Sequence, residues 1–380
     1  MKAIIITFNY GYDFETRAKY IENILREDGY EVDYLISDFD HRNKCKFKID
    51  RNNVHYIKVP VYKKNVSLKR IYSCMKFAKD VRQYLSTQKF DLVYHLAPPN
   101  STIKELSELK KEKPFTLVTE IGDMWPESLP FHGTLKKVLS PILTAWANLR
   151  NKSLDNSNLI IAECDLFKDL LKKKTKNANI FTFYFCKPFI ECDQTAIPSL
   201  NEEMVLCYLG SINNIIDIEL IEQLLKRIAV KKNVVFHIIG DGENRDELVT
   251  RSKNAGANVI FHGMIFEDEE KKAIFEKCHF ALNIMKDSVF VGMTMKSLDY
   301  FSFGIPMINS VGGDIYTIVE NDNIGFNVSH TLLPNVVREL VEIQDKDYLA
   351  MRQNVKQVHN KYFGVKSFEE KFKVALKRGK

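Results

Sequence analysis

The chain has 380 residues, of which 45% are hydrophobic and 27% charged, and its formal net charge is +6. This length is long for one hydrophobic core and suits two domains, and the composition excludes a disordered or fibrous protein. No apolar run approaches the roughly 18 residues that cross a bilayer, and the seven cysteines form no C-x-x-C pair, which favours a cytoplasmic protein without disulfides or structural zinc.

The first half of the chain alternates strand-like and helix-like segments. Strands are expected at 2–8, 32–36, 54–59, 92–96, 115–120, 159–163 and 180–185. Helices are expected at 14–28, 68–86, 101–111, 135–149 and 166–174. Such alternation predicts a parallel sheet with right-handed helical crossovers.

One polar run in this half follows a strand and stands out. It is Glu-Ile-Gly-Asp-Met-Trp-Pro-Glu-Ser at 120–128, and it contains Asp123, Trp125 and Glu127. A carboxylate at Asp123 can take part in acid–base chemistry. Equally, Asp123 can cap the next turn while Trp125 lies in the core, and the sequence leaves both interpretations open.

The second half restarts the alternation after a segment at 186–203 that holds two prolines and no clear period, which predicts a linker. Strands are expected at 204–209, 234–239, 259–261, 280–284 and 306–309. Helices are expected at 217–229, 243–255, 268–277, 294–303, 314–320 and 332–342. We therefore predict a second α/β domain.

Three glycine-ended pieces in this half indicate a nucleotide site. They are Phe-His-Ile-Ile-Gly-Asp-Gly at 236–242, Val-Ile-Phe-His-Gly at 259–263 and Lys-Ser-Leu-Asp-Tyr-Phe-Ser-Phe-Gly-Ile-Pro at 296–306. In open α/β sheets, ligands bind outside the carboxyl ends of the strands, where glycine lets the backbone approach a phosphate.

The order and spacing of these pieces resemble the donor-binding half of GT-B glycosyltransferases, in particular the retaining family 4. The run at 123–127 resembles the Asp-x-Trp-Pro-Glu element of the members that build bacterial surface glycans. The resemblance covers nearly the whole chain. It implies two doubly wound Rossmann-like domains facing a cleft: an acceptor domain at 1–190, a nucleotide-sugar domain at 191–362, and a C-terminal helix at 363–380 that packs back on the first domain.

The resemblance also implies an activity. It is transfer of a sugar from a nucleotide-sugar, with a UDP-sugar favoured, to a hydroxyl of a lipid-linked or polysaccharide acceptor, with retention of configuration. The leaving diphosphate helps to deprotonate the acceptor in that scheme, which requires no cofactor and no metal.

The donor contacts follow from the matching positions. They are Gly210, Ser211, Gly240, Asp241, Gly242, Gly292, Lys296 and Asp299. Lys296 is expected to neutralise the departing diphosphate, and Asp299 to accept hydrogen bonds from the ribose hydroxyls. The chain departs from the family at Ser211 and near Ile216, where an Arg and a Lys are usual, and at Val291, where the first acid of a Glu-x7-Glu motif is usual.

The acceptor side draws on the first domain. Asp123 falls near the site of the family's active-site His, so we count it with Lys296 as a catalytic candidate. The other acceptor candidates are Tyr10, Gly11, Arg17, Trp125 and Glu127. His95 and His132 are alternative bases, although a histidine is more often structural.

Charge is unevenly distributed, with +8 through residue 200 and −2 over the remainder. A basic half suits an anionic partner. Since no nucleic-acid motif is present, we expect contact with the inner face of the plasma membrane or a merely solvated surface. The helix at 135–149 has an apolar face, which suits either a membrane interface or a core. Its members are Leu135, Val138, Leu139, Ile142, Trp146 and Leu149.

Three other functions stay open. Val291 and the missing Arg/Lys pair suit a non-catalytic partner subunit of another transferase. A nucleotide-sugar epimerase or an inverting transferase would share the same fold. A Rossmann dehydrogenase is disfavoured, because no G-x-G-x-x-G follows the first strand.

Overall fold

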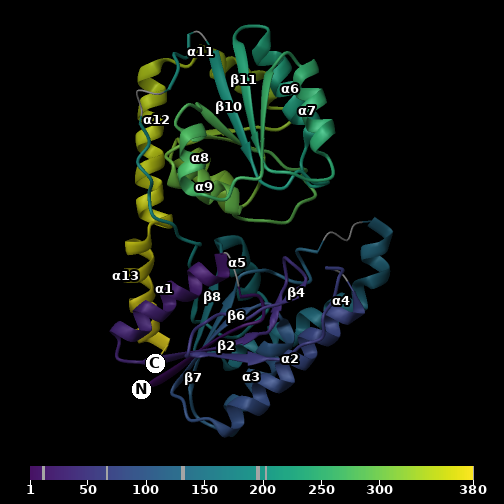
Figure 1. Ribbon diagram of the computed structural model, residues 1–380, viewed down its shortest axis with the longest axis vertical. Helices are drawn as coiled ribbons and strands as arrows, with labels where there is room; N and C mark the ends of the chain where they lie inside the picture. Colours follow the sequence, from purple (N-terminus) through teal and green to yellow (C-terminus); the bar gives the residue numbers. More distant parts are fainter. Residues whose placement is uncertain (11–12, 66, 130–132, 194–196, 202, 380) are drawn as a thin grey trace. The chain divides into compact units, whose positions relative to one another are not determined.

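The computed structural model describes residues 1–10, 13–65, 67–129, 133–193, 197–201 and 203–379. The chain divides into two compact units. The first comprises Met1–Phe185 together with Phe368–Lys380, and the second comprises Cys186–Ser367. Both units contain parallel strands joined by helices (Figure 1), which confirms the predicted α/β class.

The first unit is built on a seven-stranded parallel sheet in the order β5-β2-β1-β6-β7-β8-β9. Its strands are β1 (Lys2–Thr7), β2 (Glu31–Ser37), β5 (Val54–Ile57), β6 (Leu92–Ala97), β7 (Thr116–Ile121), β8 (Leu159–Ala162) and β9 (Ile180–Thr182). A short antiparallel pair, β3 (Phe39–Asp40) and β4 (Cys45–Lys46), lies outside this sheet. Because both faces of the sheet are covered, every residue of β6 is buried.

Helices cover both faces of this sheet. They are α1 (Asp13–Glu27), α2 (Leu68–Thr87), α3 (Asn100–Glu112), α4 (Gly133–Asn151), α5 (Asp165–Lys172) and the C-terminal part of α13 (Val365–Gly379). Figure 1 shows α1 and α13 on one side of the sheet and α2, α3 and α4 on the other. On the α13 side, the Phe372 ring packs 6.0 Å from Phe183 and 5.8 Å from Tyr94, so the last helix belongs to the core of the first unit.

The second unit has a six-stranded parallel sheet in the order β12-β11-β10-β13-β14-β15. Its strands are β10 (Glu203–Leu209), β11 (Asn233–Ile239), β12 (Asn258–Gly263), β13 (Phe280–Asn283), β14 (Met307–Asn309) and β15 (Gly325–Asn327). Its helices are α6 (Ile218–Ala229), α7 (Arg245–Asn254), α8 (Asp268–Phe275), α9 (Met295–Ser302), α10 (Asp314–Asn321), α11 (Leu333–Glu342) and α12 (Asp345–Val358).

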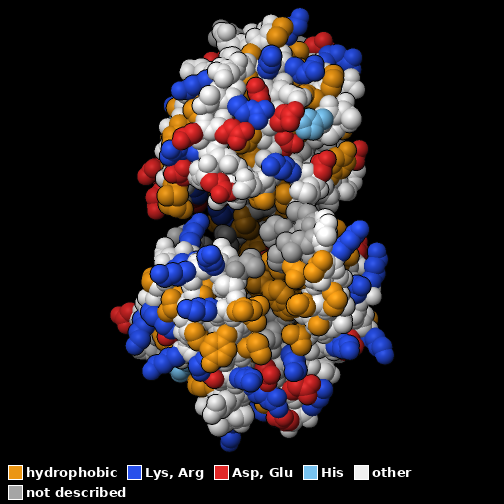
Figure 2. Space-filling model, turned by 90° about the vertical axis from the view of Figure 1, so that its right-hand side faces the viewer, with side chains coloured by type: hydrophobic (Ala, Val, Ile, Leu, Met, Phe, Trp, Pro, Cys, Tyr) orange, Lys and Arg blue, Asp and Glu red, His pale blue; other side chains and the backbone are white. Residues whose placement is uncertain are grey.

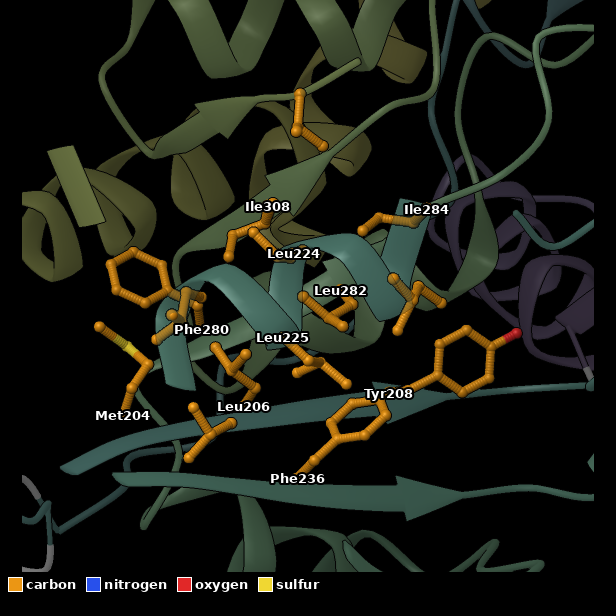
Figure 3. Close-up of a cluster of buried hydrophobic side chains, with 14 of the residues drawn as sticks. Met204, Leu206, Tyr208, Leu224, Leu225, Phe236, Phe280, Leu282, Ile284 and Ile308 are labelled. Carbon is orange, nitrogen blue, oxygen red and sulfur yellow. The ribbon is translucent and has the colours of Figure 1, made fainter. Parts of the chain in front are cut away.

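The core of this unit lies between the sheet and α6. Figure 3 shows Leu224 and Leu225 of α6 against Leu206, Phe236 and Leu282 of three strands. All are fully buried, because α6 directs one apolar face at the sheet. Tyr208 lies at one end of this cluster, and its hydroxyl points away from the other labelled side chains (Figure 3).

Strand order decides where a ligand can bind in the second unit. The chain runs from β10 outward to β12 and then returns to β13 on the other side of β10. The helices after β10 and β13 therefore pack on opposite faces of the sheet. The loops at the carboxyl ends of these two strands diverge. This is the topological switch point at which open α/β sheets bind ligands.

Helix α12 was not predicted from the sequence. Its buried side chains lie at Tyr348, Met351, Arg352, Val355 and Val358. They form a single stripe, but most of the other residues are polar, Leu349 is apolar and exposed, and one member of the stripe is charged, so the apolar period is weak. Among the described residues, no helix is long and apolar enough to cross a membrane.

Candidate functional site

The switch point of the second unit brings three segments to one edge of the sheet. Gly210 and Ser211 follow β10, residues 284–294 connect β13 to α9, and Gly312 and Gly313 lie between β14 and α10. Each segment begins at the carboxyl end of a neighbouring strand or leads into a helix N-terminus. Exposed backbone N–H groups at such positions favour phosphate.

Lys296 lies in the first turn of α9 and reaches the end of β10. Its Nζ donates to the Tyr208 hydroxyl at 3.1 Å and lies 4.3 Å from the centre of the Tyr208 ring. A Cβ placed on Gly210 would lie 3.7 Å from Cε of Lys296. The predicted partners Lys296 and Gly210 are therefore adjacent, although 86 positions separate them in the chain.

The charge of Lys296 lacks a counterion. The side chain is half-buried, and no carboxylate forms an ion pair with it among the residues described above. Burial lowers the pKa of Lys296 to about 7. A desolvated ammonium without a carboxylate gains most from an anionic ligand, because such a ligand restores the lost electrostatic stabilisation.

A buried polar network holds the start of α9. Thr294 caps the helix by accepting a hydrogen bond from the Ser297 N–H at 3.2 Å, and its hydroxyl donates to the Asn283 side chain at 3.1 Å. Asn283 donates to Asn309 at 2.8 Å, and Asn309 donates to Asn327 at 2.8 Å. This asparagine ladder joins β13, β14 and β15, so the position of α9 is tied to the sheet.

The glycines at 240 and 242 have a packing role. A Cβ on Gly240 would lie 1.9 Å from the Gly210 carbonyl oxygen, and one on Gly242 would lie 2.3 Å from the Ile212 carbonyl oxygen. Both residues have φ in the left-handed region, at 139° and 158°. They allow the loops after β10 and β11 to touch, which fixes Gly210. Asp241 lies exposed beside them and accepts from the Gly242 N–H.

Asp299 lies on α9, one turn after Lys296. Its carboxylate forms an ion pair with Lys187, from the segment before β10. Gly292 is buried, and its carbonyl accepts from the Ile315 N–H at 3.0 Å, which joins the 284–294 segment to α10.

The Gly312–Gly313 turn was missed by the sequence analysis, although a Gly-Gly pair between a strand and a helix was the available signal. No atom lies within 4 Å of a Cβ built on Gly312, so that position opens onto free space.

The first unit brings Asp123 and Trp125 to the carboxyl end of β7. Asp123 is half-buried and accepts a hydrogen bond from the Ser128 hydroxyl. Burial raises the pKa of Asp123. The Trp125 carbonyl accepts from Arg150 Nη1 at 2.7 Å, and Glu127 holds the same guanidinium at 2.6 Å. Glu127 therefore anchors the loop, and we leave it out of the acceptor contacts.

Arg17 is also a structural residue. Its Nε donates to Glu120 at 2.9 Å, Nη2 donates to the Phe183 carbonyl at 2.9 Å, and only 1% of its surface is exposed. Glu120 in turn accepts from Tyr94. Arg17 therefore does not have the position expected for an acceptor contact, because its guanidinium is buried and hydrogen-bonded in the core.

The remaining acceptor candidates differ in accessibility. Tyr10 is 6% exposed and packs edge-on against Tyr34 at 5.8 Å. His95 is fully buried on β6, and burial lowers its pKa to about 3. Such a histidine is neutral and away from solvent, which argues against its use as a base. Gly11 and His132 lie outside the described residues.

One residue of this region was missed by the sequence analysis. Arg70, in the first turn of α2, places its guanidinium 4.0 Å from the centre of the Trp125 ring. It is 7% exposed, and burial lowers its pKa. No sequence signal joins residue 70 to residue 125, because the contact depends on the order of the strands.

Comparison with known proteins agrees with this geometry. Residues 203–343 match the family model described as glycosyl transferases group 1. No curated protein matches the chain in a sequence search. Among solved structures, sucrose-phosphate synthase from Thermosynechococcus elongatus is similar over 99% of this chain and 98% of its own, with 13% identity and a TM-score of 0.73.

Two further structures resemble the chain over almost their whole length. The lipopolysaccharide outer core galactosyltransferase WaaB, in its apo form, is 16% identical, with 99% of both chains covered and a TM-score of 0.70. HepE from Anabaena, in complex with UDP, is 13% identical, with 99% of this chain and 100% of that chain covered and a TM-score of 0.71. This chain has the GT-B fold.

The family-model match lies within the second unit. The matched residues 203–343 contain the whole switch point, from β10 through the Lys296 helix to α11. Together, the family model and the structural relatives support a glycosyltransferase. Among the described residues, no group of three or more His, Cys, Asp or Glu side chains is arranged to hold a metal ion.

Proposed function

We propose that this GT-B protein transfers a sugar from a nucleotide-sugar, with a UDP-sugar favoured, to a hydroxyl of a lipid-linked or polysaccharide acceptor in cell-surface glycan synthesis. The observation that carries this proposal is the half-buried ammonium of Lys296 at the switch point, without a carboxylate partner among the described residues. The UDP and UDP-glucose complexes of HepE support the choice of nucleotide.

The chemistry assigned to Lys296 is stabilisation of the leaving group. The bond between the sugar C1 and the diphosphate oxygen breaks, and negative charge develops on that oxygen. A fixed cation at this position lowers the barrier, because it interacts more strongly with the transition state than with the ground state. The acceptor oxygen bonds to C1 on the same face, and its proton passes to the departing diphosphate.

Other residues of the site position the donor. Exposed N–H groups at Ser211 and at the Gly312–Gly313 turn would contact the phosphates, while the Gly210 N–H donates to the Ile239 carbonyl at 2.9 Å, and no metal is needed in this scheme. Asp299 would hold the ribose, with Lys187 orienting its carboxylate through the ion pair. In the first unit, Asp123 would orient the acceptor hydroxyl, since its raised pKa brings it closer to the range of a useful proton acceptor.

The deciding experiment is calorimetric titration with UDP, GDP and dTDP, followed by turnover with the corresponding sugars. Lys296→Ala should lower turnover by about 100-fold or more, the scale for losing one charge-stabilising group. Lys226→Ala is the matched control, because Lys226 is exposed on α6. The proposal fails if none of the three nucleotides binds, or if Lys296→Ala and Lys226→Ala behave alike.

Val291 is the residue that supports a second candidate function. It stands where a first acidic contact to the donor sugar is expected, so a partner subunit that binds nucleotide without transferring sugar would show the same site. Nucleotide binding without turnover, together with co-purification of a second transferase, would identify that case. Product analysis would separate an epimerase, which releases a nucleotide-sugar, and an inverting transferase, which reverses the anomeric configuration.

A further inference from the structure

Arg70 is a buried cation that forms no ion pair with a carboxylate among the described residues, although the charge of Asp123 attracts it electrostatically. Its Nη1 donates to the Asn65 carbonyl at 2.7 Å, while Nε has no hydrogen-bond partner among the described residues. The buried arginines Arg17 and Arg150 of the same unit both pair with glutamates. Burying an arginine without such a pair is costly, so the site gains stability when an anion binds.

An aromatic platform fixes the guanidinium. Trp125 lies 4.0 Å beneath it, and Trp125 packs edge-on against Trp146 of α4 at 6.0 Å. A guanidinium stacked on an indole is fixed in orientation, and its planar fork matches the oxygens of a phosphate. Asp123 lies two residues before Trp125 in the same loop and interacts electrostatically with Arg70. The group proposed to orient the acceptor hydroxyl therefore lies beside this cation.

The surroundings of Arg70 are basic and apolar together. Residues 51–79 contain eight Lys and Arg and no Asp or Glu. On the turn of α2 that carries Arg70, Leu68 is 84% exposed, Ile71 45% and Tyr72 62%. A local excess of positive charge attracts anions, and exposed apolar side chains of this size favour contact with an apolar partner.

We propose that Arg70 binds a phosphate or diphosphate group of the acceptor, next to the hydroxyl that receives the sugar. The inference deepens the proposed function by naming the acceptor class: a phosphorylated molecule, with its apolar part along α2 when the phosphate belongs to a lipid.

The two tryptophans provide a direct reporter. They are the only ones in the chain, and both lie in the first unit, with Trp125 in contact with Arg70. Titration with inorganic pyrophosphate should change their fluorescence saturably. Arg70→Gln should weaken this binding by about tenfold or more, the loss expected for a charge-assisted pair. Arg70→Lys keeps the positive charge but loses the planar guanidinium, so its pyrophosphate affinity should lie between those of wild type and Arg70→Gln.

Lys296→Ala is the matched control, because it removes the cation of the second unit. It should leave the fluorescence titration unchanged. Circular dichroism and Tm check that each Arg70 variant is folded, and Arg70→Lys carries the test if Arg70→Gln is not. The proposal is overturned if wild type shows no response, if the folded Arg70 variants respond as wild type does, or if Lys296→Ala abolishes the response.

Two further ligands identify the source of the phosphate. Geranyl diphosphate binding more tightly than pyrophosphate would assign the group to a lipid, with the chain on α2, whereas equal affinity would assign it to a soluble phosphorylated acceptor. Malonate at equal concentration should not compete, and full competition by malonate would overturn the assignment to phosphate. Because this titration needs no turnover, it stands or falls separately from UDP binding at Lys296.

Discussion

At the scale of single residues, each unit places a partly or fully buried cation near the carboxyl end of a parallel strand. Lys296 follows β13 and Arg70 lies against the loop that follows β7, each near the carboxyl end of a parallel strand. Neither forms an ion pair with a carboxylate of the described chain. If phosphate binds at these cations as proposed, it would offset the electrostatic cost of holding them unpaired, and we expect the liganded protein to be more stable than the unliganded one.

The titration of Lys296 predicts how donor affinity depends on pH. Burial lowers its pKa to about 7, and the bound diphosphate favours the protonated form. Below pH 7 the ammonium is already charged, so UDP binding takes up no proton. Above pH 7 binding must take up a proton, and affinity should fall by up to about tenfold per pH unit until the pKa of the complex is reached.

Calorimetry of UDP binding between pH 6 and pH 9 measures this directly. Lys296→Arg is the matched control, since a guanidinium stays charged over the whole range. Its affinity should vary less with pH than that of wild type. Parallel pH profiles for the two proteins would show that another group is responsible.

At the scale of elements, two features fix the shape of the proposed donor site. The loops after β10 and β11 touch through Gly240 and Gly242, and the asparagine ladder connects the ends of β13, β14 and β15. Lys296 therefore faces Gly210 because both of their elements are fixed to the sheet. The positions of the loops follow from backbone packing and buried hydrogen bonds rather than from the binding residues themselves.

Gly240→Ala should damage the site through the backbone. The new Cβ would lie 1.9 Å from the Gly210 carbonyl oxygen, and φ of 139° strains any L-residue. We expect a loss of about 1–3 kcal/mol in the free energy of unfolding together with weaker UDP binding. Urea denaturation and calorimetry measure the two effects.

Gly312→Ala is the control for this substitution. Its Cβ meets no atom within 4 Å, and no left-handed φ is involved, so stability should stay within about 0.5 kcal/mol of wild type. A stability change in Gly240→Ala no larger than that in Gly312→Ala would contradict the packing role.

At the scale of the whole molecule, the first unit presents an apolar and basic surface to solvent. Figure 2 shows hydrophobic side chains gathered on one face of this unit, with Lys and Arg side chains around them. On α4, Val138 is 69% exposed and Ile142 66%. The helix at 135–149 therefore leaves at least three members of its apolar face, Val138, Ile142 and Leu149, in solvent rather than in the core.

We expect this surface to bind anionic membranes. Flotation with phosphatidylglycerol vesicles should recover more protein than flotation with phosphatidylcholine vesicles, and high salt should release part of it, because the Debye length falls to about 3 Å at 1 M. The double variant Val138→Asp, Ile142→Asp should bind about tenfold less, since it removes apolar contact and adds repulsion.

Val230→Asp is the matched control for the membrane experiment, because Val230 is 75% exposed but belongs to the second unit. It should float as wild type does. Equal recovery on both kinds of vesicle would remove the electrostatic part of the expectation. Unchanged binding of the double variant would remove α4 from the membrane-contacting surface.

Local pattern in the sequence was enough to predict the architecture. Strands buried on both faces read as apolar runs, and their alternation with helical segments predicted two parallel sheets. The same local patterns located Lys296 and Trp125, because each lies in a short run with a recognisable order of residue types. Helix α12 was not predicted, because polar residues interrupt its single apolar stripe and the stripe includes Arg352.

Contacts between distant parts of the chain were decided only by the tertiary structure. Arg17, expected to contact the acceptor, pairs with Glu120 in the core, and Arg70 packs on Trp125, a contact that no sequence motif predicted. In both cases the partners are more than 50 residues apart. Whether a charged side chain is buried, and with what partner, depends on which strands become neighbours, and periodicity within one segment carries no information about that.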